Sequence, residues 1–513
     1  MTTLVKQELE RGAGILMPVS ALPSRYGIGT LGEESFRFVD FLKRTGCRYW
    51  QVLPVGPTSF GDSPYQSFSA FAGNPYFIDL DILVKEGLLQ EEELKKSKWY
   101  KRTDRIDYAA IYKYRFDILK KAFSRSSFKS TKEFRSFQKE NRFWLRDYSL
   151  YMAVKGHFGQ KEWSLWDEDI RFRREKAVTR YIKQLAQEID FWEFCQFKFR
   201  EQWDRVKSYA NEAGIRIIGD IPLYVSEDSS DVWVHGELFE LDEKRRPVNV
   251  AGVPPDLFSA DGQRWGNPLY RWDVMEKQDF LWWRERMKIS SHLYDVIRID
   301  HFIGVVNYYS IPASNTTAAG GCWLPGPGRK LTDVIKESIG KAKIIAEDLG
   351  VITPKVRALI QETGFPGMKV LMFGLEGPPD HEYLPHNYKD TNLVAYIGTH
   401  DNETLVGFLK HFKEEELEFV LRYFNAGTRE ELPFAILRAL YSCIADVVIV
   451  QMQDLLLLDN KARMNFPSTM GKNWQWRIKR SQYKELREEM LSEYALLFNR
   501  APGVPENKEE AAV

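Results

Sequence analysis

The sequence predicts an α/β protein built on a closed (β/α)8 barrel, a TIM barrel, with inserted, mostly helical subdomains. Two observations predict this fold: eight short apolar runs, and gaps between them that can hold helices. Most runs do not alternate strictly between apolar and polar residues, which is typical of parallel strands buried on both faces. The eight runs span residues 14–20, 49–55, 215–224, 296–301, 343–348, 369–374, 392–400 and 447–453.

The gaps between these runs provide the helices of the predicted barrel. Each gap is long enough for a crossover helix, which takes at least ~10–12 residues. After the fifth run, Thr353 is suited to cap a helix that begins at Pro354 and stops at Gly364. After the first run, residues 33–45 place their apolar side chains on one face and are followed by Gly46. Eight such strand-then-helix units favour a closed parallel barrel.

The predicted barrel forms one domain, residues 1–505, with two long insertions. Residues 59–213 are rich in Lys, Arg, Glu, Phe and Trp, with apolar residues at helical spacing, and predict a mostly helical subdomain. Residues 226–294 contain several turn signals and predict a loop subdomain beside the functional site, because long irregular segments in a compact fold are usually functional. Residues 506–513 predict a short acidic tail.

Composition excludes several classes of protein. Lys and Arg number 72, equal to Asp and Glu at 72, so the chain lacks the basic excess typical of nucleic-acid partners. No apolar run approaches the ~20 residues that span a bilayer, and the charged N-terminus does not predict a signal peptide. The widely spaced cysteines predict neither a metal site nor a disulfide framework, and we expect a cytoplasmic protein with no membrane partner. They are Cys47, Cys195, Cys322 and Cys443.

Acidic residues stand at the ends of four of the eight runs. In a parallel barrel the carboxyl ends of all strands lie on one face, where active sites are built. A single acid at a strand end is most often a helix cap or an ion-pair partner. Four like charges gathered on one face cost free energy unless a function requires them. The four acids are Asp220, Asp300, Glu347 and Asp401.

The surroundings of these acids predict different protonation states. Arg298 lies two residues before Asp300 on one strand, so the two side chains point to the same side. The guanidinium would keep Asp300 ionised, as a nucleophile must be. Glu347 follows three apolar residues, which favour the protonated form that a general acid needs. Two such carboxyl groups, ~5–5.5 Å apart, are what retaining cleavage of a glycosidic bond requires, and Asp401 would bind hydroxyls of the distorted sugar.

Histidines adjoin two of the acids and leave a metal site as one alternative. His301 and His400 could donate hydrogen bonds to sugar hydroxyls, or could bind a metal in an amidohydrolase-like barrel. The first strand lacks the His-x-His pair that the metal site would need, so we expect no metal.

A glycine motif also needs an interpretation. Residues 27–32 match G-x-G-x-x-G, but no acid ends the following run at 49–55, as a dinucleotide site would require. We interpret these glycines as turn and helix-start residues. The sequence therefore predicts no nucleotide cofactor.

From about Gly14 to Arg477 the chain resembles a known family. It is similar to the amylomaltases, or disproportionating enzymes, which are the 4-α-glucanotransferases of glycoside hydrolase family 77. Any one of the shared motifs is only suggestive, whereas the ordered set is specific. The motifs are SPYQS (63–67), GDIPLYV (219–225), PPDLFSADGQRWGNPLYRW (254–272), IRIDHFIG (297–304), AEDLG (346–350), THDNET (399–404) and NWQWR (473–477).

The resemblance implies a (β/α)8 barrel with no metal or organic cofactor. It places the nucleophile on Asp300, the acid/base on Glu347 and the transition-state stabiliser on Asp401. It implies that Arg298, His301 and His400 hold the sugar in the cleaved subsite. It puts Trp265 in a loop that folds over the cleft. Further glucan contacts implied by the resemblance are Ser63, Tyr65, Asp220, Asp256, Gln263, Trp265 and Asn465.

The implied reaction transfers a segment of an α-1,4-glucan to the 4-hydroxyl of another glucan or of glucose. It proceeds by a retaining double displacement through a covalent glucosyl-enzyme intermediate. An α-amylase-type hydrolase of α-1,4-glucans is the nearest alternative, because the residues alone do not decide between water and a sugar as acceptor. A non-catalytic glucan-binding protein is the alternative from another class, and it would not need all three acids.

Overall fold

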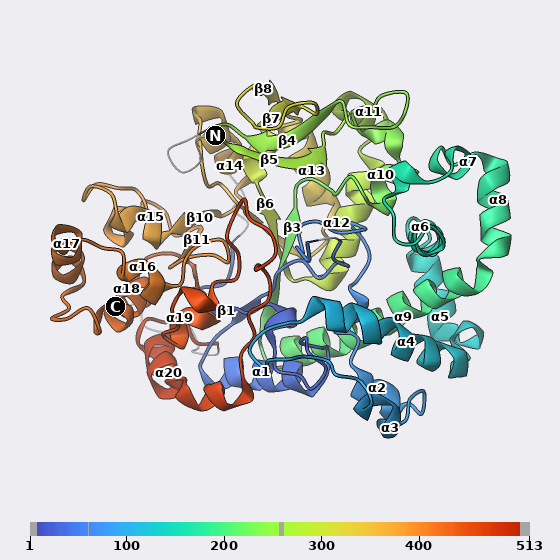
Figure 1. Cartoon of the computed structure of the whole chain (residues 1–513). Coiled ribbons are helices and arrows are strands. Elements are labelled where there is room, and N and C mark those ends of the chain that lie inside the picture. Colours follow the sequence, from blue (N-terminus) through green and yellow to red (C-terminus); the bar gives the residue numbers. More distant parts are fainter. Residues whose placement is uncertain (1–7, 60, 256–260, 503–513) are drawn as a thin grey trace, which may run out of the picture.

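The computed structural model describes residues 8–59, 61–255 and 261–502. Its centre is an eight-stranded parallel sheet, and the predicted (β/α)8 barrel is confirmed (Figure 1). The strands follow one another around the sheet in the order β10-β11-β12-β1-β2-β3-β6-β9. Their bounds are β1 Gly12–Leu16, β2 Tyr49–Gln51, β3 Arg216–Pro222, β6 Val296–Asp300, β9 Lys343–Ala346, β10 Gly367–Val370, β11 Leu393–Tyr396 and β12 Val447–Gln451.

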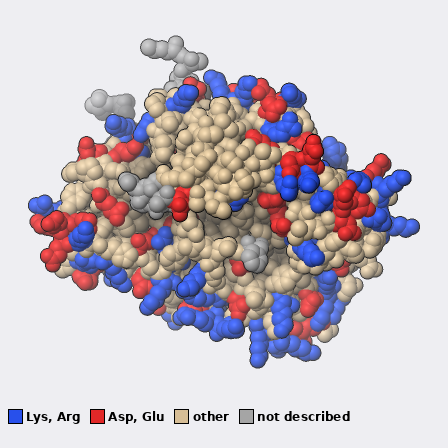
Figure 2. Space-filling model, turned by 45° about the horizontal axis from the view of Figure 1, so that its top comes forward, with Lys and Arg blue, Asp and Glu red and all other residues tan. Residues whose placement is uncertain are grey.

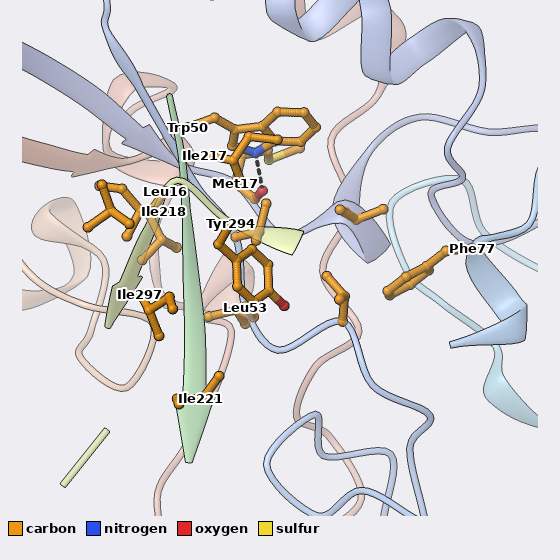
Figure 3. Packing of buried hydrophobic residues seen from close by; sticks show 14 of the residues in the cluster. Leu16, Met17, Trp50, Leu53, Phe77, Ile217, Ile218, Ile221, Tyr294 and Ile297 are labelled. Carbon is orange, nitrogen blue, oxygen red and sulfur yellow. Dashed lines mark hydrogen bonds between the residues drawn. The ribbon is translucent and has the colours of Figure 1, made fainter. Parts of the chain in front are cut away.

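The first and last strands of this sheet meet and nearly close the barrel. The backbone N–H of Ala346, at the end of β9, donates to the carbonyl of Pro366, just before β10, at 3.0 Å. Buried apolar side chains of the strands and of neighbouring segments pack together in one core cluster (Figure 3). Trp50 lies among them, and its Nε1–H donates to the carbonyl of Met17 at 2.8 Å, so its one polar atom is satisfied.

All eight predicted strands are present, but each ends before its predicted run does, and the sixth and eighth runs continue directly into helices. The run 369–374 was expected to be one strand, whereas the structure has β10 at Gly367–Val370 followed at once by α15 at Leu371–Leu375. The expectation is wrong for residues 371–374. Periodicity cannot separate a short buried strand from a short buried helix, because both are continuously apolar.

The two helices read from the sequence are confirmed. In α14, Pro354–Thr363, the Thr353 hydroxyl accepts from a backbone N–H in the first turn, and Gly364 adopts φ 68° at the C-terminal end. In α1, Glu33–Arg44, Gly32 immediately precedes the first turn, so one glycine of the G-x-G-x-x-G motif is a helix-start residue.

The described part of residues 59–213 contains eight α-helices, which lie mostly on the right of Figure 1. The longest of them, α9, packs against α4, α6 and α8. It also packs against α1 and β3 of the barrel, and so it is the crossover helix that leads from β2 to β3. The division of the chain into one domain with two insertions stays a prediction, and the predicted tail 506–513 lies outside the described residues. The helices are α2 Leu80–Lys85, α3 Glu91–Lys95, α4 Tyr108–Arg125, α5 Lys132–Glu140, α6 Leu145–His157, α7 Glu168–Arg171, α8 Glu175–Gln184 and α9 Ala186–Glu212.

A small antiparallel sheet, which the sequence analysis did not predict, lies beyond β6 at the top of Figure 1. Its order is β5-β4-β7-β8, and it joins strands from residues 226–294 to strands that follow β6. The strands are short and contain Gly and Pro, and their pairing is non-local, so the local pattern does not reveal them. They are β4 Asn249–Val253, β5 Gln263–Pro268, β7 Asn307–Pro312 and β8 Cys322–Pro325.

The remaining helices complete the barrel wall and its connections. No helix within the described residues combines the length and the apolar composition that crossing a bilayer takes. These helices are α10 Ser230–Val234, α11 Trp272–Lys277, α12 Leu281–Leu293, α13 Arg329–Ser338, α16 Leu405–Leu409, α17 Glu414–Phe424, α18 Leu432–Ser442, α19 Met452–Leu455 and α20 Glu488–Leu497.

Candidate active site

Neighbouring strands bring the predicted acids together at the carboxyl end of the barrel. β3, β6 and β9 are adjacent, and they carry or immediately precede Asp220, Asp300 and Glu347. Asp220 pairs in register with Arg298, two residues before Asp300. Asp401 follows β11 and joins the group through side-chain contacts described below. Charged side chains of both signs are interspersed around one face of the molecule, and the centre of that face is hollowed (Figure 2).

One buried guanidinium serves two of the carboxylates. Nη1 of Arg298 lies 2.7 Å from each oxygen of Asp220 and 3.1 Å from Oδ1 of Asp300. Burial acts to lower the pKa of Arg298, but these two carboxylates raise it well above its usual value. The Tyr65 hydroxyl donates to Oδ2 of Asp220 at 2.8 Å. Asp220 is completely buried, so its partners replace water entirely.

Asp300 is in a different electrostatic setting from the one expected. From the sequence, Arg298 was expected to pair with Asp300 and keep its carboxyl group ionised. In the structure, the Arg298 guanidinium binds both Asp300 and Asp220. Burial raises the pKa of Asp300 well above its usual value, and Arg298 opposes that rise. The other three carboxyl groups add to the rise, because like charges close together disfavour the ionised form. The site therefore favours holding a proton on one of its acids.

Glu347 is held by the backbone rather than by a cation. The N–H of His301 donates to its Oε2, and the N–H of Leu349 donates to its Oε1 at 3.2 Å. His301 adopts φ 53°, a left-handed conformation that is uncommon for a residue other than glycine. Burial raises the pKa of Glu347, whereas Arg298 and the two N–H groups lower it. The net rise has the direction expected from the apolar residues before Glu347.

Asp401 joins the site through two side-chain partners. Its Oδ1 accepts from Nδ2 of Asn465 at 2.6 Å, and its Oδ2 lies 3.3 Å from Nε2 of His400. The His400 ring stacks on the Tyr65 ring, with centroids 5.2 Å apart and planes at 14°. The Asp401 side chain is 43% exposed, so a ligand can reach it. Tyr65 therefore links two of the acids, contacting Asp220 by its hydroxyl and the neighbour of Asp401 by its ring.

Both site histidines have a buried ring nitrogen without a hydrogen-bond partner among the described residues. These atoms are Nε2 of His301 and Nδ1 of His400. Burial lowers the pKa of His301 to about 4 and also lowers that of His400, so neutral imidazoles are favoured at pH 7. A buried polar atom without a partner is costly unless a ligand completes it.

Trp265, on β5 of the small sheet, reaches the same site. Its ring meets the His301 ring edge to face, with centroids 4.7 Å apart and planes at 88°. Its Nε1–H donates to Oε1 of Gln263 at 3.1 Å. Ser63 lies in the turn that carries Tyr65 and accepts that residue's backbone N–H at 3.2 Å. Asp256, the remaining predicted contact, lies outside the described residues.

The sequence of this chain is similar to those of known proteins. A family model described as 4-alpha-glucanotransferase, glycoside hydrolase family 77, matches residues 17–482. The chain belongs to this family. The family suggested by the sequence motifs is confirmed.

Relatives and a solved structure match this chain over nearly its whole length. The 4-alpha-glucanotransferase of Clostridium butyricum is 45% identical over 465 residues, covering 90% of this chain and 95% of the relative. That of Thermus thermophilus is 45% identical over 481 residues, covering 92% and 95%. The structure of the amylomaltase from Streptococcus agalactiae in complex with acarbose has a TM-score of 0.93 at 42% identity. It covers 96% of this chain and 100% of that chain.

The predicted set did not include Trp474 or Tyr396. Trp474 packs with its ring 5.9 Å from His400 and 5.7 Å from Tyr65. It belongs to the quoted NWQWR motif, so the motif could have identified it. The hydroxyl of Tyr396 donates to Oε1 of Gln51 at 2.9 Å in the barrel interior, and no pattern in either strand signals that contact.

Metal binding was considered as an alternative for the histidines. Within the part of the chain that the structure describes, no group of three or more His, Cys, Asp or Glu side chains is placed to hold a metal ion. His400 instead contacts Asp401, and His301 packs against Trp265.

Proposed function

We propose that this member of the family is a 4-α-glucanotransferase that transfers segments of α-1,4-glucans to the 4-hydroxyl of another glucan or of glucose. The family match over residues 17–482 supports this activity, as do relatives that carry that name. Hydrolysis of the α-amylase type is not favoured, because these relatives are named as transferases. The observation that carries the proposal is the placement of the acid cluster around one guanidinium at the barrel's carboxyl end.

The proposed roles follow from how each acid is held. Asp300 is the nucleophile, because Arg298 stabilises its carboxylate and its side chain is 28% exposed, so a substrate can reach it. Glu347 is the acid/base, because it has no guanidinium partner of its own and burial raises its pKa. In this proposal Glu347 carries the proton before reaction, because Asp300 has a hydrogen bond from the Arg298 guanidinium and Glu347 has none. Asp401, oriented by Asn465, is the stabiliser of the transition state.

In the first half-reaction, Asp300 attacks the anomeric carbon of a glucosyl unit while Glu347 protonates the departing glycosidic oxygen. The carbon–oxygen bond to the leaving chain breaks, and an ester to Asp300 forms. In the second half-reaction, Glu347 removes the proton of an acceptor 4-hydroxyl, whose oxygen displaces Asp300. Two inversions retain the α configuration.

The other predicted residues would hold the sugar during these steps. Nε2 of His301 and Nδ1 of His400 have no protein partner and would hydrogen-bond its hydroxyls. Trp265 and Tyr65 offer aromatic faces suited to the C–H side of a pyranose. We propose the same contact role for the rest of the predicted set. Its members are Ser63, Asp220, Asp256, Gln263, Arg298 and Asn465, with the completely buried Asp220 acting through Arg298 and Tyr65.

Incubation with maltotriose tests the proposed function. Transfer should produce glucose together with a ladder of longer maltooligosaccharides, while the total concentration of reducing ends stays constant. Rising reducing ends with only shorter products would establish a hydrolase instead. Asp300→Asn should abolish turnover and retain binding of maltooligosaccharides, whereas the exposed Asp117→Asn should behave as the wild type. Normal turnover by Asp300→Asn would contradict the nucleophile assignment.

A further inference from the structure

The segment that follows the last barrel strand returns to Asp401 and carries an arginine with no assigned role. Nη2 of Arg463 donates to the backbone carbonyl of Asp401 at 2.7 Å. Nε of the same guanidinium donates to the backbone carbonyl of Asn465 at 2.7 Å. The face of the guanidinium lies over the Phe466 ring, with Cζ 4.5 Å from the centroid. One planar group thus spans the backbones of two site residues.

Those two residues are also joined directly. The side-chain amide of Asn465 donates to the Asp401 carboxylate, and its backbone N–H donates to the carbonyl of His400 at 3.2 Å. Arg463, Asp401 and Asn465 therefore form a closed ring of contacts. The position of the Asp401 carboxylate depends on this ring, because Asp401 itself follows the end of β11 and is not part of the strand.

Partial burial of the charged Arg463 guanidinium costs free energy, and its contacts with Asp401 and Asn465 offset that cost. The Arg463 side chain is half-buried, and its hydrogen bonds within the described residues go to backbone carbonyls. Both of its hydrogen bonds go to carbonyl oxygens of site residues, and neither goes to an acid. Lysine could not reproduce this geometry, because an ammonium lacks the planar fork that spans two acceptors while stacking on an aromatic ring.

We propose that Arg463 is a positioning residue for glucan transfer. By binding the carbonyls of Asp401 and Asn465 together, it keeps the Asp401 carboxylate where positive charge develops on the sugar ring. The inference rests on the proposed function and on the role given there to Asp401. A misplacement of ~1 Å in such a group can cost ~10²-fold in rate, even when substrate binding is little changed.

The first test compares two substitutions at this position with a matched control. Arg463→Met keeps the length of the side chain and removes its donors, so kcat for maltotriose should fall ~10–100-fold while KM changes less than about threefold. Arg463→Lys should give an intermediate kcat. Arg487, which lies over Phe434 with Cζ 4.0 Å from the centroid and is exposed, provides the control, and Arg487→Met should retain wild-type kcat. A wild-type kcat in either Arg463 variant would overturn the proposal.

A double-mutant cycle separates positioning from a general loss of structure. If Arg463 acts through the ring, Arg463→Met combined with Asn465→Ala should lower kcat by clearly less than the product of the two single effects. A combined effect equal to that product would overturn the proposal, because the two residues would then act independently. If Arg463→Met does not fold, as judged by its thermal transition, the same cycle with Arg463→Lys decides. The wild-type product ladder is measured in parallel, so failure of the proposed function shows as absence of that ladder.

Discussion

Arg298 and Asp220 form a buried ion pair in which a single nitrogen, Nη1, is 2.7 Å from both carboxylate oxygens. The same nitrogen reaches Asp300 at the longer distance of 3.1 Å. Asp220 therefore competes with Asp300 for the guanidinium of Arg298. This competition gives Asp220 an electrostatic influence on the proposed nucleophile, in addition to any contact it makes with a glucan.

We predict that Asp220→Asn lowers the pKa of Asp300. The substitution removes a neighbouring negative charge and leaves the guanidinium to Asp300, and both changes favour the carboxylate. Because Asp300 must be ionised to attack, activity is lost as pH falls through its pKa. The acidic limb of the kcat/KM profile should therefore move to lower pH. An unchanged limb, or a shift to higher pH, would show that Asp220 does not influence Asp300 in this way.

Glu347→Gln should separate acid catalysis from nucleophilic attack. Without the proton donor, kcat/KM with maltotriose should fall ~10²–10⁴-fold. An α-maltosyl fluoride donor, whose fluoride leaves without protonation, should lose far less in formation of the intermediate. Burst kinetics with the two donors measure this difference. The exposed Glu362→Gln serves as the control. Equal losses with both donors would contradict the assignment of Glu347 as the acid.

Gly219 is predicted to tolerate no side chain. It precedes Asp220 on β3, and a Cβ added there would lie 2.1 Å from the Tyr294 ring. Gly219→Ala should lower the free energy of unfolding by ~1–3 kcal/mol through overpacking, and should reduce kcat by displacing Asp220. Gly156→Ala in α6 is the control, because its added Cβ would meet only Gln160, at 3.8 Å, and should be neutral or stabilising. Urea unfolding measures both, and equal stability of the two variants would contradict this packing argument.

Trp265→Ala should shift the reaction toward hydrolysis. Trp265 packs against His301, and its removal would admit water beside the covalent intermediate. Reducing ends should then increase during incubation with maltotriose, while the ladder of longer products weakens. Trp323→Ala is the matched control, because Trp323 lies on β8 of the same sheet and is 40% exposed. If reducing ends stay constant in Trp265→Ala, this residue does not protect the intermediate from water.

Local pattern was sufficient for much of the barrel. The helix that begins at Pro354 was predicted from its N-cap threonine and its terminal glycine, because capping depends on residues within one turn. The eight strands were predicted from their continuous apolar character. Their boundaries were less certain, as β10 and α15 show, because the point at which a buried strand turns into a helix depends on what packs around it.

By itself, the sequence determined the order of strands, the acids at their ends and membership of the family, since each of these is recorded in residue type and spacing. Only the tertiary structure decided how the acids share their partners. The division of Arg298 between Asp220 and Asp300, the backbone cradle of Glu347 and the Arg463 ring around Asp401 join groups remote in the chain. Hydrogen bonds and burial act through space, so protonation states and positions at this site follow from packing that no local pattern encodes.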